Sequence, residues 1–129
     1  MKTISVLLLT LLCLGCGYSA PKAAQPQPGA VPVVMQLVPN TANSGGPGFM
    51  LTVNGSSFAS DASINWNGAK QTTTFMTANQ LTTAIPASAI ATPATVAVTV
   101  TNPGHPGGGI YGAGGTTAET SASMNFTIN

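Results

Sequence analysis

The sequence predicts an all-β fold in which about seven short antiparallel strands form a sandwich. Several segments alternate apolar and polar residues with a period of two, the pattern of a strand with one buried face. Clusters of glycine, proline and asparagine separate these segments at intervals typical of the turns in β-sandwiches. The many threonines, serines and glycines would also fit a disordered chain, but the regular Val, Leu, Ile and Phe positions argue against disorder.

Seven segments of the chain are expected to form strands. They are residues 33–38, 49–54, 63–66, 70–76, 80–85, 94–101 and 122–128. The fourth is rich in threonine and is expected near the edge of a sheet. Residues 86–93 form a connection, with one helical turn at 87–90. Seven short strands with regular turns predict an immunoglobulin-like sandwich.

The second and third strands carry the clearest local signals. Leu51 and Val53 are expected in the core, Gly55 forms the turn that follows, and Phe58 folds back over the sheet. In the third strand, Trp66 is expected to point inward just before an Asn-Gly pair ending in Gly68. Asn-Gly between two strands is a strong signal for a two-residue hairpin turn.

The sixth and last strands complete the predicted core. The alternation of Val96, Val98 and Val100 is the cleanest in the chain. The last strand is expected to place Met124, Phe126 and Ile128 inward. Both cysteines of the chain precede residue 17, so the sandwich is expected to lack the inter-sheet disulfide of antibody domains.

Taken in order, these motifs resemble the IPT/TIG family (immunoglobulin-like, plexin, transcription factor), from about Val33 to the end of the chain. No single motif is specific, but the ordered set is. Its pieces are Pro39, Gly45-Gly46, Leu51 to Phe58, Ile64 to Gly68, Leu81 to Ala87, Val96 to Pro103 and Asn125 to Ile128. The resemblance implies a binding or structural module of the cell envelope. Residues 33–129 are therefore interpreted as one domain.

The residues before this domain resemble a bacterial lipoprotein leader. Residues 1–15 have a positive start and an apolar run too short to span a membrane, as in a secretory signal. Leu14, Gly15 and Cys16 match the end of a lipidation motif, although Cys13 departs from it. Cys16 is therefore predicted to carry lipid and to anchor the protein to a membrane of the envelope. Ordinary secretion, with cleavage near residue 20 or 24, is the alternative.

Residues 16–32 combine the lipidation site with a stretch rich in proline, alanine and glutamine. Proline-rich segments of this kind extend as semi-rigid spacers. We therefore interpret this stretch as a tether between the membrane and the domain.

The low content of charged residues argues against nucleic-acid binding, metal binding and acid–base catalysis. Charged residues are only 4% of the 129 residues, and there is no arginine. Nucleic-acid binding is not expected, because too few cations are present to neutralise phosphates. Asp61, His105 and Glu119 are the only candidates for a zinc site or for acid–base catalysis in the domain, and we expect them to be separate. The sequence thus predicts a protein without catalytic activity, metal or cofactor.

Residues 102–121 form an insertion that is longer than in most IPT/TIG domains. His105, Ile110 and Tyr111 lie there among glycines and prolines and are candidate contacts for a partner. The first interpretation is contact with another envelope protein through this loop or an edge strand. The second is a carbohydrate-binding module in which Tyr111 stacks on a polysaccharide. The third is a purely structural spacer, with Tyr111 holding the loop onto the sandwich.

Overall fold

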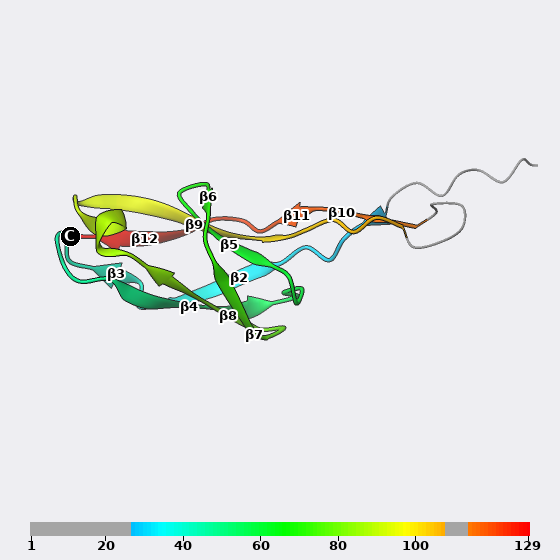
Figure 1. Ribbon diagram of the computed structural model, residues 1–129, viewed down its shortest axis with the longest axis horizontal. Coiled ribbons are helices and arrows are strands. Elements are labelled where there is room, and N and C mark those ends of the chain that lie inside the picture. The colour runs from blue at the N-terminus through cyan, green and yellow to red at the C-terminus, as the bar shows by residue number, and fades with distance from the viewer. Residues whose placement is uncertain (1–26, 108–113) are drawn as a thin grey trace, which may run out of the picture.

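The computed structural model describes residues 27–107 and 114–129 (Figure 1). The predicted signal peptide, Cys16, Ile110, Tyr111 and most of the predicted tether lie outside these residues. The elements are β1 (Gln27–Pro28), β2 (Val33–Val38), β3 (Thr41–Ala42), β4 (Phe49–Ser56), β5 (Ser63–Trp66), β6 (Ala69–Lys70), β7 (Thr73–Thr77), β8 (Gln80–Ile85), the 3₁₀ helix η1 (Ala87–Ile90), β9 (Ala94–Asn102), β10 (Thr116–Thr117), β11 (Glu119–Thr120) and β12 (Met124–Ile128).

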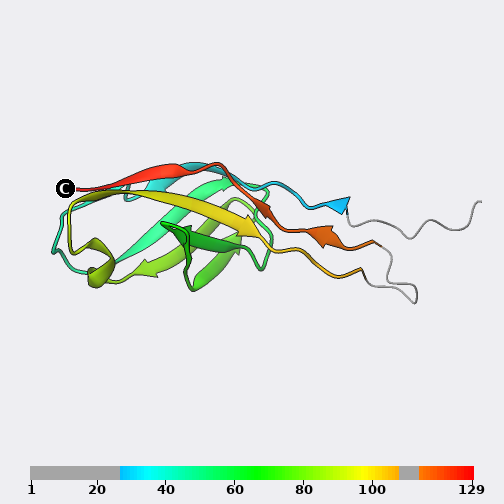
Figure 2. The same cartoon turned by 90° about the horizontal axis from the view of Figure 1, so that it is seen from above.

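Two sheets pack face to face, as the sequence predicted (Figure 2). The first sheet has the order β2-β4-β8-β7, and the second has the order β3-β12-β9-β5-β6, with β11 also paired to β9. The first strand of the sandwich is divided between the two sheets, as β2 and β3. β2 pairs antiparallel with β4, whereas β3 pairs parallel with β12 in the opposite sheet. This is an immunoglobulin-like sandwich, and its described residues contain no cysteine.

The core follows the period-two pattern of the strands. Every second residue of β9, from Val96 to Val100, is buried, and Leu51 and Val53 of β4 are fully buried against them. The Phe126 ring lies at the centre of an aromatic group. Its centroid is 5.5 Å from that of Phe49 and 5.0 Å from that of Trp66. Burial of these side chains supplies the main stabilisation of a sandwich without a disulfide.

Two glycines of the sequence signature have distinct structural reasons. Asn67 and Gly68 have φ angles of 50° and 83°, so the β5–β6 hairpin needs the left-handed conformation that glycine adopts freely. Glycine is required at position 55 because neighbouring atoms leave no room for a Cβ. A Cβ there would overlap the carbonyl oxygen of Val33 and lie 2.6 Å from Cζ of the buried Phe58.

The prediction of one strand over residues 70–76 is wrong. The chain forms β6 in one sheet and β7 in the other, and it crosses between the sheets at Gln71 and Thr72. The crossing is fixed because the Gln71 amide donates to the Ile64 carbonyl at 2.8 Å. The last strand also starts later than predicted, at Met124, and Met124 is only half-buried.

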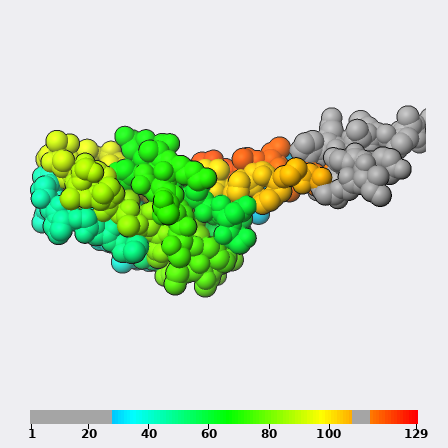
Figure 3. All heavy atoms as spheres, in the orientation of Figure 1, coloured from blue at the N-terminus to red at the C-terminus, as the bar shows by residue number. Residues whose placement is uncertain are grey.

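The insertion at residues 102–121 forms a narrow arm in its described part. We define the arm as residues 27–30, 103–107 and 114–120. β1 pairs parallel with β10, and His105 pairs with Thr116 as an antiparallel bridge. Figures 1 and 3 show the arm projecting from one end of the sandwich, opposite to the C-terminus. The end of the predicted tether is thus bound to the insertion.

Candidate functional site

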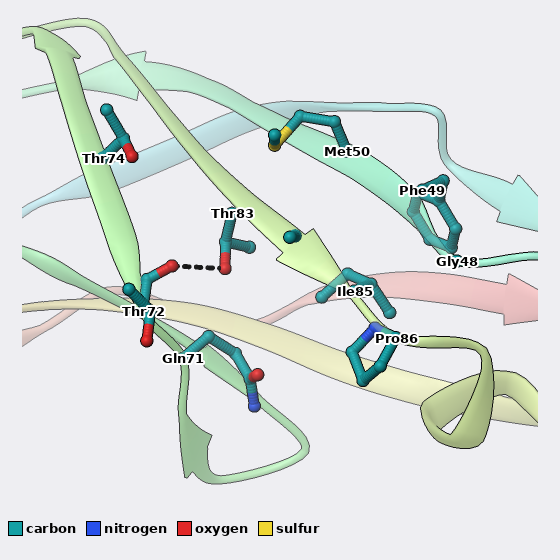
Figure 4. Close-up of a pocket in the computed structure, with 10 residues that line it drawn as sticks. Gly48, Phe49, Met50, Gln71, Thr72, Thr74, Thr83, Ile85 and Pro86 are labelled. Atoms are coloured by element: carbon teal, nitrogen blue, oxygen red, sulfur yellow. Dashed lines mark hydrogen bonds between the residues drawn. The ribbon is translucent and has the colours of Figure 1, made fainter.

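An open groove of about 770 Å³ lies beside β7 (Figure 4). It exists because the strands of the first sheet differ in length. β8 pairs with β4 along its whole length, but β7 pairs with β8 only as far as Thr83. The backbone of Ala84 and Ile85 therefore has no strand beside it on the β7 side. The chain enters this sheet only at Thr73, so the residues just before it, Gln71 and Thr72, do not pair with this backbone.

Hydrogen bonds hold the rim of this groove in place. The Thr83 hydroxyl donates to the Thr72 carbonyl at 2.7 Å, which joins β8 to the start of β7. The amide of Ile64 in the opposite sheet donates to the Thr73 hydroxyl at 2.8 Å. The beginning of β7 is therefore bound to both sheets and is a fixed edge.

The groove has no charged lining residue. Its apolar part is formed by Phe49, Met50, Ala84, Ile85 and Pro86, and three threonines, Gln71 and Gly48 form the rest. Met50 is 59% exposed and presents an apolar side chain to the groove. The lining therefore suits an uncharged, extended segment with an apolar side chain, and it offers no group for acid–base chemistry.

A second arrangement of side chains joins the arm to the sandwich. Asn102 is 4% exposed and ends β9 on the same face as the core valines. Its Nδ2 donates to the carbonyl oxygens of Ala30, at 2.7 Å, and Ser57, at 2.8 Å. Its Oδ1 accepts from the Ala59 amide at 3.0 Å. One amide therefore binds the N-terminal segment and the β4–β5 loop to β9.

The expectation that His105 and Asp61 lie apart is wrong. His105 Nε2 lies 2.7 Å from Asp61 Oδ2, so the arm contacts the β4–β5 loop. The pairing of His105 with Thr116 in the arm, through two backbone hydrogen bonds of 3.0 and 2.8 Å, brings the ring to this position. The two side chains are 56% and 48% exposed. Solvent screens such a pair, and its contribution to stability is small.

The His105 contact resembles part of a catalytic triad in composition only. Thr116 Oγ1 lies 3.4 Å from Nδ1 but also accepts from the His105 amide at 3.1 Å. The groove beside β7 includes neither His105 nor Asp61. Glu119 accepts from the Thr117 hydroxyl at 3.0 Å. Among residues 27–107 and 114–129, no three His, Cys, Asp or Glu side chains gather as metal ligands.

The residues of the predicted core signature occupy the interior or the turns. The buried ones are Leu51, Val53, Phe58, Trp66, Val98, Val100 and Phe126. Trp66 is 6% exposed, so its ring is not available for stacking on a sugar. Of the predicted contact residues, His105 is exposed on the arm, whereas Ile110 and Tyr111 lie outside the described residues.

Sequence reasoning missed both the groove and Asn102. The groove results from a difference in strand length that no local pattern reports. Asn102 had a detectable signal, because it continues the even-numbered positions of Val96, Val98 and Val100 onto the buried face. A polar residue at a buried position needs hydrogen-bond partners, and here it has three.

The part of the chain that the structure describes contains no helix that is both long and apolar enough to cross a membrane. A comparison with curated proteins gives no match to the chain. A comparison with protein families matches the model of the IPT/TIG domain over residues 32–127. That range includes both sheets of the sandwich and the described part of the insertion. The chain therefore belongs to the IPT/TIG domain family of immunoglobulin-like modules.

Proposed function

We propose that this protein is an exported, non-catalytic binding module that is anchored to the bacterial envelope through lipid on Cys16 and contacts another envelope protein. Membership of the IPT/TIG family supports a binding or structural role. The observation that carries the proposal is the arm. Its strand β1 lies near the end of the predicted tether and pairs with β10 of the insertion. The insertion thus binds the segment that leads from the anchor to the sandwich.

Lipid attachment is tested by labelling. Cells that express the full chain should incorporate radiolabelled fatty acid into the protein, and Cys16→Ser should abolish the label, because the thiol that accepts the lipid is removed. Cys13→Ser is the matched control and should retain the label. Label that persists in Cys16→Ser would contradict the anchor.

Partner binding is tested by affinity capture from crosslinked envelopes of the native host. The full chain should retain one reproducible protein, and deletion of residues 107–115 should weaken this capture because it removes the end of the insertion. Ser88→Ala, an exposed substitution in η1, is the control. Unchanged capture by the deletion variant would remove the insertion from the proposal. Capture of polysaccharide without a protein would favour the carbohydrate-binding interpretation instead.

A further inference from the structure

We propose that the edge formed by β7 and the adjoining groove binds a second copy of this chain, so that two β7 strands pair antiparallel about a two-fold axis near Thr74. The continuous sheet formed in this way would contain the four strands of the first sheet from each copy. This contact does not depend on the lipid anchor or on the envelope partner.

β7 is an edge strand that carries no charged residue and no proline, and its ladder with β8 is interrupted at Met76. Natural edge strands usually carry lysine or proline, or lie under a loop, so that they do not pair with another chain. Residues 72–77, TTTFMT, contain no charge, proline or glycine and have high β-propensity. The opposite edge, β2, lies between Pro32 and Pro39. β7 therefore presents the less protected of the two edges of its sheet.

β7 has apolar side chains at one end and the apolar groove at the other. Phe75 is 38% exposed and Met76 is 53% exposed. Met76 lies in a register shift of the β7–β8 ladder, between Phe75 and Thr77. The groove begins at the opposite end of the strand, where Gln71 and Thr72 form its rim.

A two-fold axis would place the apolar end of β7 in one copy beside the groove of the other copy. In an antiparallel pair centred on Thr74, the apolar end of each strand lies opposite the first residues of the other. In this register Phe75 of one copy lies opposite Thr73 of the second copy, and Met76 lies opposite Thr72, at the mouth of the second copy's groove. Each copy thus supplies the apolar residues for the other copy's groove. A self-complementary patch of this kind is what an isologous contact requires.

The two surfaces that would meet carry no charge and therefore do not repel each other. Two identical surfaces always bring equal charges together, and such contacts are costly. Neither the groove lining nor β7 carries a charged residue. Lys70 is the nearest charge along the chain, on β6 of the other sheet. Lys70 thus lies on a sheet that takes no part in the proposed contact.

The test uses disulfide crosslinking of the full chain, whose domain has no cysteine of its own. Thr74→Cys places the new thiol at the axis, where paired residues are close enough for a disulfide. Thr127→Cys is the matched control, an exposed threonine on β12 of the other sheet. Under mild oxidation, Thr74→Cys should give roughly tenfold more linked dimer than Thr127→Cys, after subtraction of the dimer formed by the parent chain.

A second pair of variants tests the groove contact. Met76→Lys in the Thr74→Cys chain should lower the linked fraction about tenfold, because a charge would enter an apolar site. Met76→Leu should retain it. Both substitutions are at an exposed position, and circular dichroism checks that the fold is kept. Equal crosslinking by Thr74→Cys and Thr127→Cys, or crosslinking of Thr74→Cys to another protein instead of a second copy, would overturn the proposal.

Discussion

At the scale of single residues, Asn102 connects the predicted tether to the domain. Its side chain makes three hydrogen bonds to backbone groups of other segments while it is almost fully buried. Removing it leaves two carbonyl oxygens and one amide without their partner, and an unsatisfied buried group costs more than the net value of a hydrogen bond. The arm and the β4–β5 loop should both loosen as a result.

We therefore expect Asn102→Ala to lower the free energy of unfolding by about 2–4 kcal/mol. Unfolding in urea, followed by Trp66 fluorescence, measures the change. Asn125→Ala on β12 is the control, since Asn125 is exposed and its side chain has no hydrogen bond among the described residues. A stability of Asn102→Ala equal to that of Asn125→Ala would contradict this role.

The residue scale also shows what a sequence reveals and what it does not. Alternation placed Val98, Val100 and Phe126 in the core, and all three are buried. The contact of Asp61 with His105 could not be predicted. It joins residues 44 positions apart through a hydrogen bond that depends on how the arm folds. Local patterns report which face a side chain occupies, but not which distant loop it meets.

At the scale of elements, the arm is built by the close approach of backbones. A Cβ on Gly104 would lie 2.5 Å from the Thr116 carbonyl oxygen and 2.9 Å from the Ala118 amide nitrogen. No side chain fits there without separating the two segments. In the described part of the arm, the ladders are the short β1–β10 pair and the bridge at His105, and β11 joins the arm to β9. The part of the arm beyond β11 should therefore open without unfolding the sandwich.

Gly104→Ala is expected to increase the amide exchange rate of Thr116 at least tenfold, because the bond from this amide to the His105 carbonyl is lost. Amides in the centre of β9 should keep their exchange rates. Hydrogen exchange measured by NMR separates the two regions, and Ala118→Ser, at an exposed position, serves as the control. Equal acceleration in β9 would mean that the arm and the sandwich unfold together.

The strands also show where a prediction from the period-two pattern succeeds and where it fails. The predicted ranges of β2, β5 and β8 agree with the structure, as does the helical turn at η1. The error over residues 70–76 has a physical cause. A strand that stops and resumes in the opposite sheet keeps an extended, threonine-rich sequence throughout. The crossing at Gln71 depends on a hydrogen bond to β5, which the local sequence does not report.

At the scale of the whole molecule, the protein is almost without charge. Among the described residues, the one contact between an acidic and a basic side chain is that of Asp61 with His105, and it is exposed. Stability therefore rests on the apolar core and on hydrogen bonds rather than on electrostatics. Solubility must rest on the threonines and asparagines of the outer faces, such as Asn65, which donates to the hydroxyls of Thr99 and Thr101.

The melting temperature should accordingly change by less than about 3 °C between 0.05 and 0.5 M sodium chloride, because screening acts on few charge pairs. Differential scanning calorimetry measures this directly. Asp61→Asn should respond to salt in the same way, because the exposed contact that it removes contributes little to stability. A strong salt dependence that disappears in Asp61→Asn would show that this pair matters more than its exposure implies.

The fold of the whole molecule was predictable, whereas its surfaces were not. Alternation, turn residues and the family motifs all depend on the core, and they led to the correct sandwich. The arm and the groove result from unequal strand lengths and from pairing between β1 and β10, which are far apart in sequence. Such features place few constraints on local sequence, so the candidate site became visible only in the structure.

The division of the first strand between the sheets also determines how the protein resists a pulling force. A load between the arm and the C-terminus acts at opposite ends of the molecule (Figure 1). β3 and β12 are parallel, so this load slides one strand along the other. The hydrogen bonds that Thr127 and Asn129 donate to Asn40 and Ala42 must then break together rather than one after another. Such shear geometry slows forced unfolding, which is governed by the unfolding rate.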